Sequence, residues 1–240
     1  MAVIEIVRPK VEPVTLAEAK KQCRVDSDFD DDLIADDIVT ARLDCENFTH
    51  RAFITQTWQL ITDHFPGTAE HYQGYTDLGI MGDSALGLGV PPVGYTYRFQ
   101  SEVYFRAGAI IVPRPRLRCV DFIKYLDENG DVQTLDPSQY VVDTANEPAR
   151  IAPAPNLNWP LTLISVRAPV LNAVVVQYQC GYGDKPEDVD HRAKKAIKML
   201  VAHWYDNRPA AIAGYRVDAI EMPLAVERLL YGIKVIYAAS

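Results

Sequence analysis

The chain has 240 residues, an apolar fraction of 48% and a net charge of −8 at neutral pH. The apolar fraction is typical of a globular protein and excludes a chain disordered over its whole length. The negative charge argues against a protein whose main task is to grip nucleic acid, because phosphate binding needs clustered lysines and arginines. No apolar run approaches the roughly 20 residues of a membrane-spanning helix, so we expect no membrane partner.

The N-terminal part of the chain predicts an extended segment followed by two helices. Residues 1–14 contain two prolines, which prevent a helix, and their alternating apolar residues favour a strand or an arm. Thr15 and Glu18 have the spacing of a capping box, which predicts a short helix ending near Arg24. A longer helix is predicted over residues 31–50, because apolar residues recur there at helical spacing and its acidic start suits the helix dipole.

The link between these two helices is strongly acidic. Asp26, Asp28 and Asp30 fall at the first, third and fifth positions of a calcium-loop template. The template then fails, because Asp31 replaces its glycine and Asp37 replaces its bidentate glutamate. We therefore predict an acidic surface without a metal, made of these residues: Asp28, Asp30, Asp31, Asp32, Asp36 and Asp37.

Residues 55–180 carry the signals of a β region. Strands are predicted from alternating and β-branched residues over these ranges: 55–65, 120–126, 132–135, 139–143, 149–151 and 172–180. The Gly- and Tyr-rich segment 67–108 is too long for an ordinary loop, and we expect an extended hairpin or flap. The flap is either a surface loop or a contact arm that uses its aromatic residues: Tyr72, Tyr75, Tyr95, Tyr97 and Phe99.

A strong helix is predicted from about Asp184 to Asn207, with Asp184 as N-cap and Glu187 completing a capping-box-like pair. We expect the rest of the chain to pack on its apolar stripe: Val189, Ala193, Ile197, Leu200, Val201 and Trp204. Three lysines lie off this stripe, and they either are solvated or touch DNA phosphates or an acidic partner: Lys194, Lys195 and Lys198.

A last helix is predicted over residues 223–238, and it is apolar on more than one face. It either belongs to the core or docks into another subunit as a helix-in-groove anchor. The residues that we expect to make such a docking contact are Val226, Leu229, Leu230, Ile233, Ile236 and Tyr237.

The order of the predicted elements indicates an α+β fold with three parts. Residues 1–54 supply N-terminal helices, residues 55–180 an inserted antiparallel β region, and residues 181–240 the core helix and C-terminal helix, with the helices of both ends packed together. The five histidines show no metal-binding spacing, and the chain has neither a phosphate-binding loop nor a nucleophile elbow. We therefore predict no catalytic residue, metal or cofactor. The four scattered cysteines are expected to be free thiols.

Several blocks of the sequence follow the order and spacing of a known family. They are VTLAEAK (residues 14–20), RVD (24–26) with LI (33–34), RAFITQTW (51–58), PRPRL (113–117), YQCGYGD (178–184) and HWYDNR (203–208). In these blocks the chain resembles the head–tail adaptor, or connector, proteins of long-tailed DNA bacteriophages. The resemblance covers most of the chain except residues 67–106, where typical members run almost directly into the next strand.

The resemblance implies a structural virion protein without enzymatic activity, with an α-helical core and a β insertion. It implies a ring, usually of twelve copies, at the head–tail interface of the virion, built from subunits made in the host cytoplasm. The implied partners are other copies of the chain, the portal protein, and a stopper or tail terminator. Genomic DNA would pass through the lumen without sequence-specific binding.

The resemblance also assigns roles to segments of the chain. The C-terminal segment typically contacts the portal in this family, which assigns the docking role to the last predicted helix. The acidic residues near Asp28 would lie on the surface or in the lumen, where negative charge repels DNA. The flap would contact a neighbouring subunit or a tail-side protein.

Two other classes of protein remain open. Another neck component, a stopper or tail terminator, is the nearer alternative, but the helix–β–helix order and the blocks at 178–184 and 203–208 favour an adaptor. A small hydrolase that uses the scattered Asp and His residues is the other, and it lacks any spaced catalytic constellation.

Overall fold

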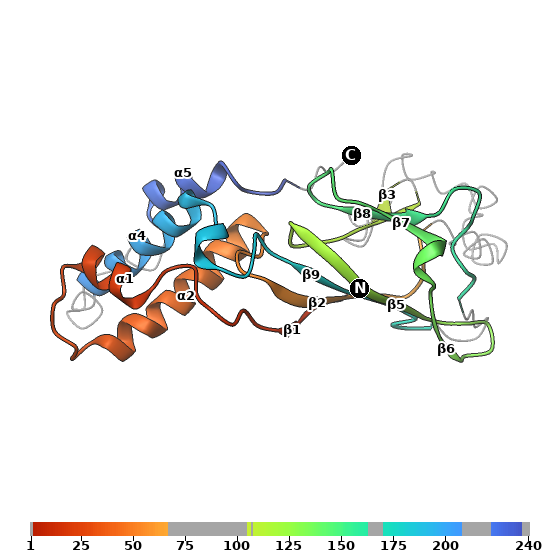
Figure 1. Cartoon of the computed structure of the whole chain (residues 1–240), viewed down its shortest axis with the longest axis horizontal. Helices are drawn as coiled ribbons and strands as arrows, with labels where there is room; N and C mark the ends of the chain where they lie inside the picture. The colour runs from red at the N-terminus through yellow and green to blue at the C-terminus, as the bar shows by residue number, and fades with distance from the viewer. Residues whose placement is uncertain (1, 67–104, 107, 163–169, 208–221, 237–240) are drawn as a thin grey trace, which may run out of the picture.

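The computed structural model describes residues 2–66, 105–106, 108–162, 170–207 and 222–236 and shows an elongated molecule, with helices at one end and two β-sheets at the other (Figure 1). The helices are α1 (Leu16–Cys23), α2 (Asp31–Thr49), α4 (His191–Asn207) and α5 (Leu224–Tyr231). The strands are β1 (Ala2–Val7), β2 (Gln56–Thr62), β3 (Phe105–Arg106), β4 (Ala109–Ile111), β5 (Leu117–Leu126), β6 (Val132–Thr134), β7 (Tyr140–Asp143), β8 (Arg150–Pro153) and β9 (Val174–Cys180). Two 3-10 turns, η3 (Pro137–Gln139) and η4 (Pro186–Asp188), complete the described elements. The predicted α+β class is confirmed.

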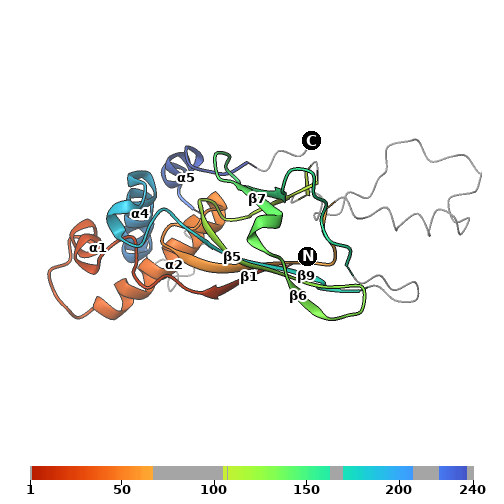
Figure 2. The same cartoon turned by 45° about the vertical axis from the view of Figure 1, so that its right-hand side comes forward.

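The strands form two antiparallel sheets that lie as two layers (Figure 2). The larger sheet has the order β1-β2-β9-β5-β6, and the smaller has the order β3-β4-β8-β7. A shared apolar core fills the space between them, with Leu60 and Ile123 from the larger sheet and Ile110 and Ile151 from the smaller. Because β1 pairs with β2, the start of the chain is a sheet strand and lies apart from the N-terminal helices with which the sequence grouped it.

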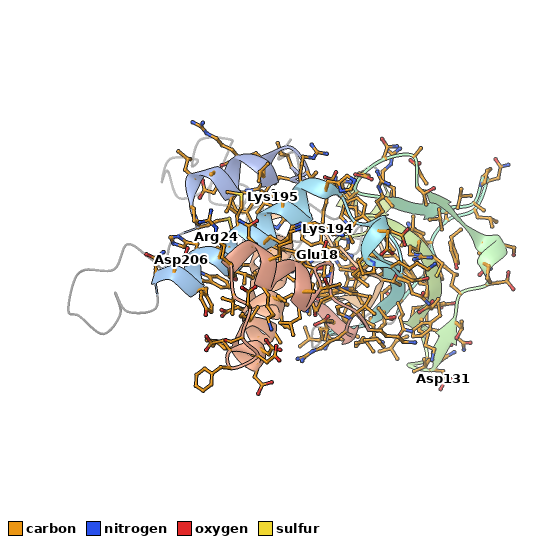
Figure 3. The ribbon with its side chains drawn as sticks, turned by 60° about the vertical axis from the view of Figure 1, so that its left-hand side comes forward. Glu18, Arg24, Asp131, Lys194, Lys195 and Asp206 are labelled. Atoms are coloured by element: carbon orange, nitrogen blue, oxygen red, sulfur yellow. The ribbon has the colours of Figure 1, made fainter. Side chains whose placement is uncertain are left out.

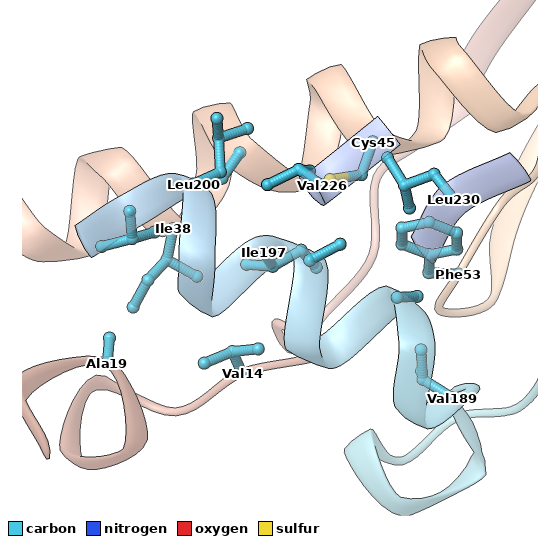
Figure 4. Close-up of a cluster of buried hydrophobic side chains, with 14 of the residues drawn as sticks. Val14, Ala19, Ile38, Cys45, Phe53, Val189, Ile197, Leu200, Val226 and Leu230 are labelled. Atoms are coloured by element: carbon cyan, nitrogen blue, oxygen red, sulfur yellow. The ribbon is translucent and has the colours of Figure 1, made fainter. Parts of the chain in front are cut away.

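The four helices enclose a second apolar core (Figure 4). α4 contacts α1, α2 and α5, so it occupies the centre of the bundle. Its predicted stripe is buried at four positions: Ala193, Ile197, Leu200 and Val201. Val189 is also buried but precedes the helix, and Trp204 is half-buried at its far end. Burial of each of the larger side chains, Ile197, Leu200 and Val201, contributes about 1.5–3 kcal/mol.

The N-terminus of α4 differs from the prediction. The helix begins at His191, seven residues after the expected N-cap. Asp190 is the residue that caps it, because its Oδ1 accepts a hydrogen bond from the backbone N–H of Arg192 at 2.8 Å. Asp184 pairs instead with Arg118, whose Nη1 lies 2.9 Å from its Oδ1.

The last helix is also shorter than predicted, since α5 ends at Tyr231 and residues 232–236 are not helical. Gly232 follows the helix, and glycine is a poor helix former. Its carbonyl oxygen accepts a hydrogen bond from Arg192 Nη1 at 3.0 Å. The Arg192 side chain thus satisfies a carbonyl group that has no partner within the helix, at the point where α5 ends.

Gly181, directly after β9, has no room for a side chain. Its φ is +137°, and a Cβ there would lie 2.7 Å from the backbone carbonyl carbon of Ile54. Gly108 has a φ of +76° with nothing within 4 Å of a Cβ added there, so it is a control for a positive φ without a steric contact. We expect Gly181→Ala to lower the free energy of unfolding by roughly 3 kcal/mol and Gly108→Ala by about 1 kcal/mol, measured by urea denaturation. Equal losses would contradict the close approach to Ile54.

Candidate assembly surfaces and the junction that positions them

Three blocks of the sequence meet where the helices join the sheets: residues 51–58, 113–117 and 178–184. The N–H of Tyr182 donates to the carbonyl of Phe53 at 3.1 Å. The N–H of Gly181 donates to the carbonyl of Arg116 at 2.9 Å. Backbone hydrogen bonds therefore join segments that are far apart in the chain, and this junction fixes the helical unit relative to the sheets.

A buried carboxylate, Glu46 of α2, lies at the centre of this junction and is 4% exposed. It accepts hydrogen bonds from Arg42 Nη1 at 2.8 Å, from the N–H of Phe53 at 2.7 Å and from Gln56 Nε2 at 2.8 Å. Burial raises the pKa of Glu46, while the charge of Arg42 and the N–H of Phe53 oppose this effect. Arg42 also pairs with Glu12, 2.8 Å from its Nε. The network attaches α2 to the start of β2.

A second ion-pair network, around Glu147, connects the smaller sheet to the same place. Glu147 Oε2 lies 2.6 Å from Arg51 Nη2, and Oε1 lies 2.8 Å from Arg116 Nε. Burial alone would raise the pKa of Glu147, but the hydrogen bonds and charges of the two arginines lower it below its ordinary value. Both guanidinium groups lie near the ring of Tyr182, at 6.0 and 5.1 Å from its centroid.

A half-open hollow of about 420 Å³ lies beside this pair, lined by Arg116, Leu117, Thr144, Asn146, Glu147 and Ala149. The one carboxylate among these lining residues, Glu147, pairs with two arginines, so it is not available as a general acid or base. Within the described residues, no three His, Cys, Asp or Glu side chains gather as metal ligands, and no helix is long and apolar enough to cross a membrane. Burial raises the pKa of the Cys45 thiol to about 12, far from that of a reactive cysteine.

The acidic residues that the sequence singled out do not act alike. Lys20 Nζ lies 2.7 Å from an oxygen of Asp28 and 2.7 Å from one of Asp31, so these two carboxylates attach the start of α2 to α1. The hydroxyl of Tyr205 donates to Asp30 Oδ2 at 2.8 Å, which connects the same link to α4. Part of the acidic segment therefore stabilises the helical bundle.

Asp32 and Asp36 are exposed, and their carboxylates make no hydrogen bond or ion pair with the part of the chain that the structure describes, whereas Asp37 is half-buried and has an interaction. Large apolar side chains accompany the two exposed carboxylates, a feature that the sequence analysis missed. They are Phe29, 93% exposed, Leu33, 40% exposed, and Leu43, 42% exposed. The helical spacing of α2 already puts Leu33 and Leu43 off the side that carries the buried Ile34 and Ile38, whereas Phe29 precedes the helix and no periodicity places it.

The residues predicted to dock through the last helix divide into two groups. Val226, Leu230 and Ile233 are buried in the helical core of this same chain, and Leu229 packs partly against it. Ile236 is 80% exposed, whereas Tyr237 lies outside the described residues. The core residues therefore fix the segment in place, and they offer no surface to another subunit in this conformation.

The outer side of α5 carries exposed apolar residues that the sequence analysis did not select. Leu224 is 63% exposed and Tyr231 is 60% exposed. The Tyr231 ring packs edge-on against Phe48 at 5.4 Å, and Lys234 Nζ lies 4.3 Å from the centroid of the Phe48 ring. Tyr231, Phe48 and Lys234 therefore form one contact group at the end of α5, and Ile236 is exposed farther along the chain. The predicted contact-arm residues, Tyr72, Tyr75, Tyr95, Tyr97 and Phe99, lie outside the described residues.

The fold is similar to that of chains in solved necks of gene transfer agent (GTA) particles. The neck of the empty GTA particle with C6 symmetry contains a chain that matches at a TM-score of 0.65 and 13% sequence identity, over 98% of this chain and 96% of that one. Chains in the native GTA virion and in the native neck with C12 symmetry match at TM-scores of 0.62 and 0.57, with 15% and 14% identity and the same coverage. No protein-family model and no curated protein sequence matches the chain.

The buried Glu46 network makes a prediction about stability. Glu46→Gln removes the charge that balances Arg42. It also replaces one acceptor oxygen by an NH2 donor, which must face either Arg42 Nη1 or the two donors that share Oε1, the Phe53 N–H and Gln56 Nε2. We expect the free energy of unfolding to fall by roughly 3 kcal/mol, measured by urea denaturation of the full chain.

Glu128→Gln is the matched control, because Glu128 is exposed in the turn before β6. It should change the free energy of unfolding by no more than about 0.5 kcal/mol. Equal unfolding midpoints for the two variants would show that the Glu46 contacts do not hold the junction together.

Proposed function

We propose that this chain is a structural virion protein, a head–tail adaptor that forms a ring of about twelve copies under the portal of a tailed phage-like particle. The observation that carries the proposal is the match along 98% of this chain to a chain of a solved particle neck, at a TM-score of 0.65. The C6 and C12 symmetries of the compared necks support a closed ring. The chain would act without catalysis, at the head–tail interface of the virion after assembly in the host cytoplasm.

The ring would extend the DNA channel and present an attachment surface for the next neck or tail protein. A net charge of −8 on each chain gives such a ring an acidic field, which disfavours adhesion of the DNA phosphates. Segment 67–108, with its many tyrosines, remains our candidate arm toward a neighbouring subunit or the tail-side protein.

We assign the portal contact to the exposed surface of α5 and the residues after it: Leu224, Tyr231 and Ile236. The buried Val226 and Leu230 support this surface from below. The backbone beyond the helix is also fixed, since the N–H of Val235 donates to the carbonyl of Thr49 at 2.9 Å. A rigid apolar surface costs little ordering entropy when a partner binds.

A stopper or tail terminator is the second candidate within the neck. The likeness to neck chains supports it as well as an adaptor, because those structures are described only as necks and a virion. The two roles differ in the expected partner, since an adaptor binds the portal directly and a stopper or terminator binds farther along the neck.

Negative-stain electron microscopy of the purified chain, alone and mixed with purified portal rings, tests the proposal. We expect closed rings with a central channel, formed by the chain alone or on the portal. Rings that do not bind the portal would favour the stopper or terminator. A chain that neither forms rings nor binds the portal would overturn the proposal.

A surface variant tests the portal assignment without disturbing the core. Tyr231→Ser combined with Ile236→Ser should weaken binding to portal rings about tenfold or more, because it removes two exposed apolar side chains. Removal of the whole segment from residue 223 would also delete Val226 and Leu230 from the core and is therefore the weaker experiment.

The control is Val132→Ser combined with Val141→Ser, which removes two exposed apolar side chains from the sheets. Co-sedimentation with portal rings measures both variants at equal concentration. Undiminished binding by the α5 variant would contradict the assignment.

A further inference from the structure

The exposed side of α2 combines large apolar groups with carboxylates that have no partner in the described structure. We define this α2 outer face by five residues: Phe29, Asp32, Leu33, Asp36 and Leu43. A phenylalanine that is 93% exposed is unfavourable in water and is typical of a contact surface. A surface that only lined a DNA channel would be polar and would not need this exposed phenylalanine.

A basic surface lies on the other helices of the bundle. α1 and α4 are adjacent, because Lys194 Nζ lies 3.8 Å from Glu18 Oε1 and Lys195 Nζ donates to Gln22 Oε1 at 3.3 Å. Glu18, Lys194 and Lys195 lie together where α1 crosses α4, whereas Arg24, at the end of α1, lies nearer Asp206 (Figure 3). We define the α1–α4 basic face by five residues: Lys21, Arg24, Lys194, Lys195 and Lys198.

The two faces point in different directions. α2 packs on α4 through the helix side that carries Ile34, Ile38 and Cys45, and the outer face is on the opposite side. Lys21, Arg24 and Lys195 are exposed, and Lys194 and Lys198 are half-buried beside the buried stripe of α4. In a closed cyclic ring each chain contacts two neighbours head to tail. It therefore needs two different, complementary surfaces on opposite sides.

We propose that the α2 outer face docks on the α1–α4 basic face of a neighbouring copy, and that this contact closes the ring. The apolar residues Phe29, Leu33 and Leu43 would exclude water at its centre, while Asp32 and Asp36 pair with Lys21 and Lys195. This inference rests on the proposed ring and adds the surfaces through which its subunits meet.

Charge reversal tests the contact in the full-length chain. The variant with Asp32→Lys and Asp36→Lys should raise the protein concentration needed for half-assembly about tenfold or more, as should the variant with Lys21→Glu and Lys195→Glu. A chain that carries all four changes restores opposite charges at the contact and should assemble again. Mass photometry measures ring yield, on portal rings if the unmodified chain assembles only there.

Two further variants separate the effect of the charges at the contact from the effects of net charge and of the apolar side chains. Glu128→Lys with Asp131→Lys makes the same change in net charge at exposed positions of the β5–β6 turn and should leave assembly unchanged. Phe29→Ser with Leu33→Ser should weaken assembly at all salt concentrations, whereas the charge-reversed pairs should matter less at high salt, since added salt screens exposed charges. Each variant should stay folded at the assay temperature, with a melting temperature lowered by about a few degrees at most where Asp32 in the first turn of α2 is reversed.

The outcomes distinguish this inference from the proposed function. Rings that form equally well with either charge-reversed pair, or that the four changes together fail to restore, would overturn the docking contact and leave the adaptor proposal standing. Normal rings whose particles release DNA slowly would assign Asp32 and Asp36 to the lumen instead. An unmodified chain that neither assembles nor binds portal rings would overturn both.

Discussion

The charge of Glu46 must be balanced in a place that water does not reach, and much of the architecture follows from this constraint. A buried carboxylate is stable only when hydrogen-bond donors and a cation surround it. Arg42 comes from the same helix, but the other donors come from the segment that enters β2. Arg114 also donates to the Glu46 carbonyl at 3.0 Å. The helical bundle and the sheets can therefore form only in one relative arrangement.

Local signals were sufficient to predict most elements. The capping box of Thr15 and Glu18 is present in the structure, and the hydrogen bonds that define it join residues three positions apart. The alternating run before Cys180 became β9, whose residues are buried and half-buried in turn. The order of helices and strands then indicated the α+β class. These predictions succeeded because each depends on the periodicity of a short segment.

The junction and the surfaces could not be predicted in the same way. Arg51 and Ile233, whose carbonyl oxygen accepts from Arg51 Nε, lie 182 residues apart in the chain. The apolar content of the last helix gave no indication of which side faces this chain's own core. The sequence therefore left open whether Val226 and Leu230 belong to the core or dock, and the structure has them buried. Asp184 fits an N-cap by spacing, but its side chain pairs with Thr55 and Arg118, which come from distant parts of the chain.

The hydrogen bonds after α5 have a mechanical consequence. Arg51 binds the Ile233 carbonyl, and Thr49 binds the N–H of Val235, directly before the chain enters β2. A force on residues 233–235 would thus reach α2 and the segment that enters β2 through these hydrogen bonds as well as through the buried Ile233. The two ends of this elongated molecule would therefore respond to such a force as one rigid body.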